Sequence, residues 1–385
     1  MTNNTTHIVL FIGSLKAGGA ERQITLLAKN LVEKGYKVSL VTIYPGGFYD
    51  RFLIGDMFFN RIILHERRKC STILRIIQLI IVPYMLRRYL FQINFECIYS
   101  MLDFSNLFAL FATIGKLRQK LVWGHRASDV PSGWKMRIAD SLCILFSKSV
   151  PLMICNSKVG LRLAKRRGYR PQQMSVVPNG IDTEFFRYDG RAAAYFREDI
   201  GVARNQPLVG LVGRIAPMKD HSNFIKSASI VRQSVKDVKF IIVGEGLTGY
   251  CTKLKNFTYS LGFDNAFLWI GNRTDMPAVY SALDVLISSS SSGEGFSNVI
   301  GEAMACETPC VVTDVGDSSW IVGYTGMVVP PRNTEALAEG IVSVFGFGRC
   351  PECRDRIEEN FSVDMMVENT LSCLRNIGIN TEMTR

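Results

Sequence analysis

Short runs of β-branched and aliphatic residues alternate with helical patterns twice along this chain, and this alternation most restricts its possible folds. In the first half it predicts a helix over 20–34 and strands at 7–12, 37–43, 97–101, 121–123 and 152–155. Strands that alternate with helices indicate βαβ units, and hence a parallel sheet covered by helices. We therefore expect a Rossmann-like α/β domain in the first half.

The alternation restarts after residues 176–186, where a strand runs into Pro and Asn-Gly turn signals. It then predicts strands at 208–212, 239–243, 266–270, 285–287 and 309–312, with helices at 222–233, 250–261 and 298–305. A length of 385 residues also favours two domains, at about 100–200 residues each. We predict doubly wound domains over 1–185 and 186–362, and a C-terminal helix, 363–385, that packs back on the first.

Ligands of such sheets bind outside the carboxyl ends of the strands. Two facing domains of this kind are expected to form a cleft lined by strand-to-helix loops. The functional residues should therefore lie on those loops.

Positive charge is concentrated in the first half. Residues 1–185 hold 26 Lys and Arg against 11 Asp and Glu, a net of +15, whereas the remainder holds 19 against 23, a net of −4. Such asymmetry predicts an anionic partner for the first half, either a nucleic acid or an anionic membrane surface. Residues 67–91 combine Arg67, Arg68 and Lys69 with an apolar run, and are interpreted either as a basic helix lying on a membrane or as a core helix with a cationic edge.

The ten cysteines are scattered, and several lie in apolar runs as buried thiols do, which favours a reducing compartment. Cys350 and Cys353 form a lone CxxC pair without partners at zinc spacing, so we expect two free thiols and no metal site. We see no signal peptide, and the run 73–91 is interrupted by arginines. These features predict a cytoplasmic protein.

A glycine-bearing loop follows the first strand and opens a helix, with Gly18 and Gly19 in the segment Gly-Gly-Ala-Glu-Arg. Backbone N–H groups at a helix start suit an anionic ligand. The loop is not a GxGxxG, and it lacks the acidic residue about 20 positions on that a nicotinamide-dependent dehydrogenase needs. The dehydrogenase is therefore only a minor alternative.

The segment 288–305 places two carboxylates beside a helix N-terminus. Glu294 lies in a glycine-flanked loop, Ser297 and Asn298 are expected to cap the next helix, and Glu302 lies about one turn inside it. Helix N–H groups can hold a diphosphate, a helical carboxylate can bind a ribose diol, and a loop carboxylate can bind sugar hydroxyls. This combination predicts a sugar-nucleotide site.

Cations for the phosphates are supplied by the loop after the strand at 208–212. Arg214 offers a bidentate fork and Lys219 a point charge. Together they can neutralise a leaving diphosphate without a metal ion.

At this point the second half resembles glycosyltransferase family 4, the retaining enzymes of GT-B fold. The resemblance covers about residues 175–330 and rests on Val-Pro-Asn-Gly-Ile-Asp at 177–182, Val-Gly-Arg and Lys219 in 212–219, Val-Gly-Glu-Gly at 243–246, Gly271 with Asp275, Tyr280 and Asp284, Glu294 with Glu302, and Asp-Val-Gly at 314–316. The first half matches more loosely, through its Gly-Gly-Ala-Glu-Arg loop and Trp-Gly-His-Arg at 123–126. The resemblance implies that the first half is the acceptor domain, whose sequence varies with the acceptor.

The resemblance implies a role for each matching residue. Arg214 and Lys219 hold the diphosphate, Glu302 the ribose, and Glu294 the donor sugar, while His125 contacts that sugar near its anomeric carbon. The catalytic residues implied are Arg214, Lys219, Glu294 and His125. The donor-binding residues implied are Gly18, Gly19, Gly213, Arg214, Lys219, Gly271, Arg273, Glu294, Gly295, Phe296, Ser297, Asn298, Val299 and Glu302.

Family 4 enzymes are proposed to work without a protein nucleophile: the diphosphate departs and the acceptor hydroxyl attacks from the same face. The resemblance thus implies electrostatic, metal-independent catalysis that needs no cofactor beyond the nucleotide-sugar co-substrate. Glu294 is then a sugar ligand.

We predict a retaining hexosyltransferase that uses a UDP-sugar, or as second choice a GDP-sugar. Its expected acceptor is a lipid-linked or surface glycan, as in polysaccharide, O-antigen or capsule biosynthesis, at the inner face of a cytoplasmic membrane. The alternatives are a nucleotide-sugar 2-epimerase of the same fold and a non-enzymatic basic membrane- or nucleic-acid-binding module. No nucleic-acid motif is present, which disfavours nucleic acid as the partner.

Overall fold

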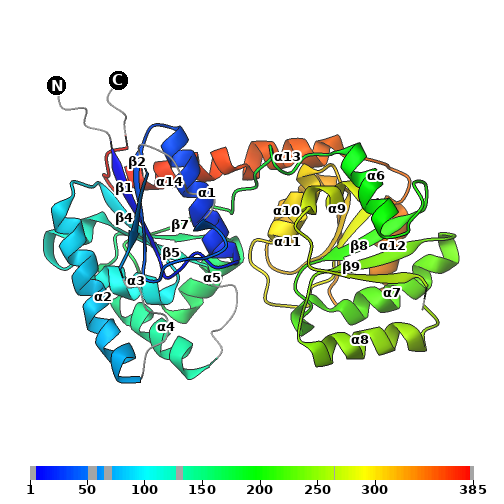
Figure 1. The fold of residues 1–385 in the computed structure, drawn as a ribbon, viewed down its shortest axis with the longest axis horizontal. Coiled ribbons are helices and arrows are strands. Elements are labelled where there is room, and N and C mark those ends of the chain that lie inside the picture. The colour runs from blue at the N-terminus through cyan, green and yellow to red at the C-terminus, as the bar shows by residue number, and fades with distance from the viewer. Residues whose placement is uncertain (1–5, 51–58, 65–71, 127–132, 264, 382–385) are drawn as a thin grey trace. The chain divides into compact units, whose positions relative to one another are not determined.

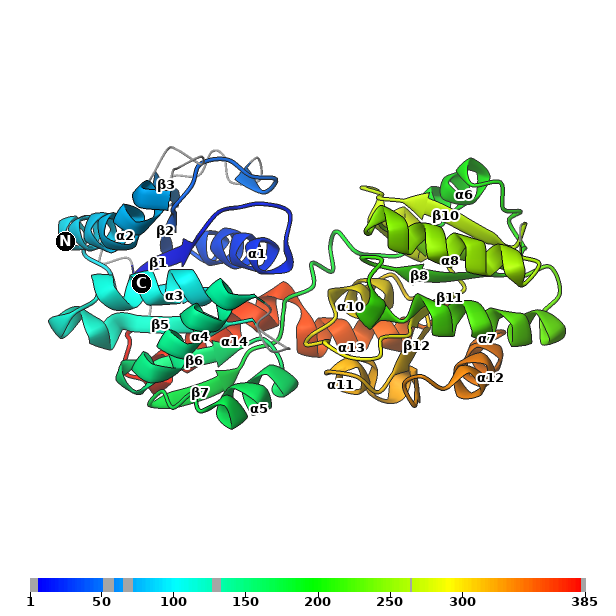
Figure 2. The same cartoon turned by 90° about the horizontal axis from the view of Figure 1, so that it is seen from below.

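In the computed structural model the chain forms two compact units, residues 1–180 with 363–385 and residues 181–362. The structure describes residues 6–50, 59–64, 72–126, 133–263 and 265–381. Each unit is a parallel sheet with helices on both faces, as Figures 1 and 2 show. The predicted α/β class is confirmed, with the first unit completed by the C-terminal helix.

The sheet of the first unit has the strand order β3-β2-β1-β4-β5-β6-β7, and every pairing is parallel. Its strands are β1 (His7–Ile12), β2 (Lys37–Thr42), β3 (Phe59–Ile63), β4 (Cys97–Met101), β5 (Leu121–His125), β6 (Leu152–Cys155) and β7 (Gln173–Val176). The central strands β1, β4, β5 and β6 are buried along their whole length. Burial on both faces explains their nearly continuous apolar sequences.

Helices cover the two faces of this sheet in separate layers. α1 (Gly19–Glu33) and α14 (Val363–Asn376) pack on one face, while α2 (Thr72–Gln92), α3 (Asp103–Ala112), α4 (Trp134–Phe146) and α5 (Lys158–Arg167) pack on the other. Gly168 ends α5 in the left-handed conformation, with a φ of 99°, which glycine adopts at little cost. The short 3-10 helices Gly115–Lys120 and Ser147–Ser149 follow α3 and α4.

The structure describes part of the segment 67–91. Arg67, Arg68 and Lys69 lie outside the described residues, as do the side chains of 72–79. From residue 80 onward α2 buries Val82, Leu86 and Leu90 against the sheet. This part of α2 is therefore a core helix on its inner side, and no helix in the described part of the chain is long and apolar enough to cross a membrane.

The second unit has the strand order β10-β9-β8-β11-β12-β13, again entirely parallel. Its strands are β8 (Leu208–Val212), β9 (Lys239–Val243), β10 (Phe267–Gly271), β11 (Val285–Ser288), β12 (Cys310–Thr313) and β13 (Met327–Val329). One face carries α6 (Gly190–Asp199), α9 (Met276–Ala282), α10 (Asn298–Ala305), α11 (Ser318–Val322) and α13 (Pro351–Phe361). The other carries α7 (His221–Ser234), α8 (Thr248–Ser260) and α12 (Thr334–Val344).

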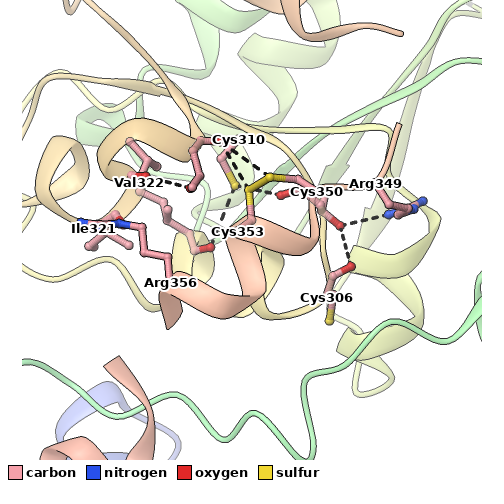
Figure 3. Close-up of a disulfide and its surroundings, with 11 residues drawn as sticks. Cys306, Cys310, Ile321, Val322, Arg349, Cys350, Cys353 and Arg356 are labelled. Carbon is pink, nitrogen blue, oxygen red and sulfur yellow. Dashed lines mark hydrogen bonds between the residues drawn. A yellow bond between two sulfur atoms is a disulfide. The ribbon is translucent and has the colours of Figure 1, made fainter. Parts of the chain in front are cut away.

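A disulfide joins Cys350 to Cys353 at the start of α13 (Figure 3). This corrects the prediction of two free thiols: Pro351 begins the helix and brings the two Cα atoms to 5.3 Å. The side chain of Cys353 is fully buried, and its Sγ lies 3.4 Å from the Thr325 carbonyl oxygen. The other cysteines described are free.

The arginine that follows this disulfide ties α13 to α10. Arg354 Nη1 donates to the carbonyl oxygens of Ala305, at 2.8 Å, and of Phe186, at 3.1 Å. Ala305 is the last residue of α10. The guanidinium therefore satisfies a carbonyl that the end of α10 leaves without a partner in its own helix.

Candidate active site

The motif residues of the second unit lie on loops at one edge of its sheet. The loop after β8 carries Gly213 and Arg214 and ends in a 3-10 turn at Lys219. The loop after β11 carries Glu294, and α10 begins directly after it. Because β8 and β11 are parallel neighbours, these loops meet at the carboxyl ends of both strands.

An ion pair joins two of these loops. Lys219 Nζ donates to Glu294 Oε1, and the Ser290 hydroxyl donates to the same oxygen at 2.6 Å. The side chains of Lys219 and Glu294 are mostly buried, so their charges depend on one another for stabilisation. Removing either one would leave an uncompensated charge in a poorly solvated place.

The serine run at 288–292, expected to be a simple loop, supports this ion pair. Ser289 Oγ donates to the Lys219 carbonyl at 2.8 Å, and the Ser291 N–H donates to the Met218 carbonyl at 2.8 Å. Thr313 Oγ1, at the end of β12, donates to the Ser290 carbonyl at 2.6 Å. The run therefore positions the loop after β8, a role that five consecutive serines at a strand end could have suggested.

Glu302 is held from the neighbouring helix α9. The Tyr280 hydroxyl donates to Glu302 Oε2 at 2.7 Å, and both side chains are buried. Ser297 occupies the N-cap position of α10, but its hydroxyl makes no capping hydrogen bond, which corrects the predicted cap. That hydroxyl therefore does not occupy the first N–H groups of the helix.

Other predicted donor ligands differ in what their side chains can offer. Arg214 is exposed, with Nη2 3.8 Å from Met218 Sδ. Arg273 is held in ion pairs with Asp275, at 2.7 Å, and Asp199, at 2.9 Å. The donor contact of Arg273 stays a prediction.

The predicted donor-binding residues around the start of α10 offer mainly backbone groups to a ligand. Phe296 is buried and its ring packs on Phe361, at 5.4 Å between centroids, so its side chain belongs to the core. Gly295 accepts the Asp317 N–H through its carbonyl at 3.1 Å. Gly271 has a φ of 73°, and Asn298 and Val299 form the first turn of α10.

Two glycines allow loops to approach backbone to backbone. A Cβ on Gly244 would lie 2.1 Å from the Gly213 carbonyl oxygen, and one on Gly316 would lie 2.5 Å from the Glu294 carbonyl oxygen. Both glycines also have positive φ angles, 135° and 67°. The Asp-Val-Gly motif at 314–316 thus fixes the backbone that carries Glu294.

A small cavity adjoins this cluster within the second unit. It is lined by Leu211, Val212, Lys219, Ile287, Ser288, Ser289, Ser290, Ser297 and Val299. Apolar strand ends form its floor, and Lys219, the serines and the N-cap of α10 supply its polar groups. A concave site with a few polar groups at the strand ends is where such sheets bind ligands.

In the first unit, Gly18 and Gly19 form the start of α1. Gly18 is the N-cap, makes no side-chain cap, and has an extended backbone. A Cβ there would meet the Glu21 carboxylate at 2.2 Å, so a side chain would have to displace Glu21. Burial raises the pKa of Glu21. The Glu21 carboxylate therefore lies beside the start of α1.

His125 ends β5 as a buried residue. Its ring lies against Tyr169, at 5.1 Å between centroids, and its Nε2 has no hydrogen-bond partner among the described residues. Burial, assisted by the charge of Arg167, lowers the pKa of His125 to about 4. The imidazole is therefore neutral near pH 7 and can take part in a hydrogen bond without carrying a charge.

Comparison with known proteins bears on both units. Residues 206–346 match the family model described as Glycosyl transferases group 1, and residues 17–185 match that of Glycosyltransferase Family 4. The chain belongs to this glycosyltransferase family. Among the residues that the structure describes, no group of three or more His, Cys, Asp and Glu is placed to hold a metal ion.

Two curated relatives illustrate the sequence similarity of this glycosyltransferase. It is 26% identical to the UDP-Gal:alpha-D-GlcNAc-diphosphoundecaprenol alpha-1,3-galactosyltransferase of Escherichia coli, over 51% of this chain and 53% of that protein. It is 32% identical to the D-inositol 3-phosphate glycosyltransferase of Mycobacteroides abscessus, over 44% of this chain and 39% of that protein. The matched part spans about half of the E. coli relative and less of the other.

Solved structures match the glycosyltransferase over nearly its whole length. A glycosyltransferase from Rickettsia africae aligns with a TM-score of 0.79 at 20% identity, covering 98% of this chain and 100% of that one. Anabaena Alr3699/HepE in complex with UDP and glucose aligns with a TM-score of 0.78 at 22% identity, covering 96% and 99%. At these identities the likeness shows the fold, which is GT-B.

Proposed function

We propose that this glycosyltransferase moves a hexose-type sugar from a UDP-sugar to a lipid-linked glycan, with retention of the anomeric configuration. The observation that carries the proposal is the pairing of Lys219 with Glu294 beside the start of α10, the helix that also holds Glu302. The proposal assigns Lys219 to the diphosphate, Glu294 to sugar hydroxyls and Glu302 to a ribose diol. The printed name of the E. coli relative supports UDP as the nucleotide and a diphosphate-linked lipid as the acceptor class.

In the proposed reaction the bond between the anomeric carbon and the diphosphate breaks, and its electron pair leaves with the phosphate oxygen. Lys219 and Arg214 stabilise that developing charge, while Glu294 is released from Lys219 to bind the sugar. The acceptor hydroxyl forms the new bond on the same face, and its proton passes to the departing phosphate oxygen. Neutral His125 is proposed to orient the sugar near the reacting carbon, because its pKa of about 4 rules it out as a proton donor at neutral pH.

The remaining predicted donor contacts stay part of the proposal. Gly18 and Gly19 are proposed to approach the donor phosphate. Gly213, Gly271 and Arg273 are proposed to lie along the nucleotide, and the backbone of 295–299 along the sugar. The reaction is proposed to need no metal or other cofactor, and to take place at the cytoplasmic face of a membrane, where a lipid-linked acceptor is presented.

Thermal unfolding with UDP, GDP and their sugars tests the donor. A nucleotide that binds only the folded protein raises the Tm, by an amount that grows with its concentration over its Kd. We expect UDP to raise the Tm more than GDP does. If neither nucleotide raises the Tm, the proposed use of a nucleotide-sugar donor is contradicted.

Product analysis tests the reaction. Purified enzyme, a UDP-hexose and a short-chain diphosphate-linked lipid glycan should release UDP and give an α-linked product by nuclear magnetic resonance from an α-linked donor. Adding a chelator should leave the rate unchanged. Conversion of the donor sugar without any acceptor would indicate the epimerase instead.

A further inference from the structure

The outer side of α4 carries an apolar stripe that does not face the core. Trp134, Ile138, Leu142 and Leu145 recur at helical spacing on one side of α4 and are all exposed, Trp134 by 69% and Leu145 by 67%. The opposite side of the helix, at 139 and 143, is buried against the sheet. A helix of an ordinary soluble domain has one apolar side, directed at the core. The helix α4 has two apolar sides, and packing in the core does not explain the outer one.

The neighbouring helix α2 repeats this arrangement. Val82, Leu86 and Leu90 point inward, whereas Ile80, Tyr84 and Phe91 are exposed. α3, which lies between α2 and α4 in the same layer, adds Phe104 and Phe111 (Figures 1 and 2). The outer side of α2, α3 and α4, named here the α2–α4 face, therefore gathers large apolar side chains from three helices.

The charges of the α2–α4 face have one sign. Residues 80–92, 103–120 and 133–149 contain two acidic residues, Asp103 and Asp140, and both are buried. Asp140 is also occupied, since it accepts hydrogen bonds from Arg167 and from the Tyr169 hydroxyl. The remaining charged side chains of these segments are basic. Three of them, Arg87, Arg118 and Lys120, donate to backbone carbonyl oxygens and are half-buried, whereas the others are exposed: Arg88, Lys116, Lys135, Arg137 and Lys148.

We infer that the α2–α4 face docks on an anionic lipid bilayer, with its aromatic and aliphatic side chains in the headgroup region and its lysines and arginines beside the lipid phosphates. Exposed apolar side chains gain by leaving water, and basic side chains gain beside anionic lipid. Lys and Arg can keep their charges at the surface while their stems lie along apolar neighbours, as the Arg87 guanidinium does 4.7 Å from the Phe91 ring centre. The inference rests on the proposed function only in that a lipid-linked acceptor would be met at such a surface.

Charge argues against a second copy of this chain as the occupant. Pairing two α2–α4 faces would place cations opposite cations, which opposes association. A bilayer with anionic headgroups supplies the opposite charge and also takes up the apolar side chains. An anionic bilayer therefore matches both the positive charge and the apolar side chains of the α2–α4 face.

Vesicle flotation of the full chain tests the inference. We expect the protein to float with vesicles of phosphatidylcholine mixed with phosphatidylglycerol and to stay behind with phosphatidylcholine alone. Raising the salt concentration should weaken binding, because salt screens surface charges. Equal binding to both vesicles, or binding to neither, would overturn the inference.

Paired variants identify the face. Trp134→Ser with Leu145→Ser should reduce the bound fraction by about tenfold or more, since both side chains lose burial in the interface. Lys135→Glu with Lys148→Glu should weaken binding by at least the roughly fivefold per charge that a basic residue contributes beside an anionic surface. The matched controls, Tyr259→Ser and Lys253→Glu, alter an exposed aromatic and an exposed lysine on α8 and should bind like the wild type. Normal flotation of both α4 variants would contradict the inference.

Two further measurements separate other causes. Each variant should keep the wild-type Tm and its UDP-induced shift, so that its loss of flotation reports lost docking and not misfolding. A wild type that keeps the UDP-induced shift but does not float rejects docking alone. A missing UDP shift in the wild type would reject the proposed function instead, whatever the vesicles do. Sedimentation equilibrium should give the same mass for the wild type and the Trp134→Ser, Leu145→Ser variant, and a wild-type dimer lost in that variant would assign the face to self-association.

Discussion

The two units share a parallel sheet with helices on both faces, yet they treat their polar and charged residues differently. In the second unit the site residues are fixed by one another, as Lys219 is by Glu294 and Glu302 by Tyr280. In the first unit basic side chains gather beside an apolar outer face, that of α2, α3 and α4. The unit that we propose to bind the nucleotide is thus built from paired side chains, whereas the unit that we propose to meet the acceptor is distinguished more by its surface.

The largest expected effect tests whether the paired charges of the second unit act in catalysis. Lys219→Ala should lower turnover by about 10²–10³-fold, as loss of a transition-state donor does elsewhere. UDP release at saturating donor and acceptor measures it. Lys226→Ala, which removes an exposed lysine of α7, is the matched control. Near wild-type turnover in Lys219→Ala would mean that the pair with Glu294 is only structural.

A second, smaller effect assigns Glu302 to the ribose. Glu302→Gln should weaken UDP binding by roughly tenfold to a hundredfold, because hydrogen bonds to a charged group contribute about 1.5–3 kcal/mol. Calorimetry with UDP and with inorganic diphosphate measures it. Diphosphate lacks a ribose and should bind the variant and the wild type alike. A parallel loss for both ligands would move Glu302 from the ribose to the phosphates.

Lowering the pH should reduce the free energy of unfolding of the second unit more than that of the first. Burial, with the charge of Lys219 as a second cause, lowers the pKa of His221 to about 4. The unfolded chain then takes up a proton first as the pH falls below about 6.5, so the stability that neutral His221 contributes is lost between pH 6.5 and 4, by about 2 kcal/mol at pH 5. Urea unfolding followed by hydrogen exchange, unit by unit, should show this.

In the first unit, pKa shifts of opposite direction partly cancel, so acid reduces its stability less. His125 behaves like His221, and burial also lowers the pKa of His7. Burial next to Asp140 raises the pKa of Asp103 to about 6, so the folded unit takes up a proton more readily than the unfolded chain between pH 6 and 3.8 and gains stability there. Asp103→Asn should remove this gain, and an equal acid response in both units of the wild type would contradict the comparison.

The smallest effect concerns the disulfide of the second unit. Replacing Cys350 and Cys353 together with serine should lower its free energy of unfolding by about 2 kcal/mol or less, because the closed loop is short. Urea unfolding measures this, and reductant should bring the wild type to the same value. Cys251→Ser, which alters a free cysteine of α8, is the control and should respond to reductant no more than the wild type does.

Residue types and spacing predicted what depends on local patterns. Buried parallel strands such as β1 and β8 are continuous apolar runs, and the sequence predicted both with their observed bounds. The edge strands β3 and β13 were not predicted, and of β7 only its end was, as the strand that runs into the turn signals at 176–186. β7 is only partly buried, and its sequence, Gln-Met-Ser-Val, carries little apolar signal.

Contacts between distant residues could not be predicted in the same way. Lys219 and Glu294 are 75 positions apart, and only the adjacency of β8 and β11 brings them together. A lone CxxC fits free thiols as well as a disulfide, so the state of Cys350 depended on the turn made at Pro351. The helix α4 was not among the predicted helices, so its outer stripe was missed with it.

The packing of α14 in the first unit also determines which unit can complete its core first during synthesis. Val363, Met366, Val367 and Leu371 pack in the same core as β1 and α1, although nearly the whole chain separates them in sequence. A ribosome delivers the N-terminal strands first, but their core lacks these side chains until α14 has been made. The second unit has all of its residues earlier, by Ser362. The half of the protein that is made first is therefore the last that can be completed.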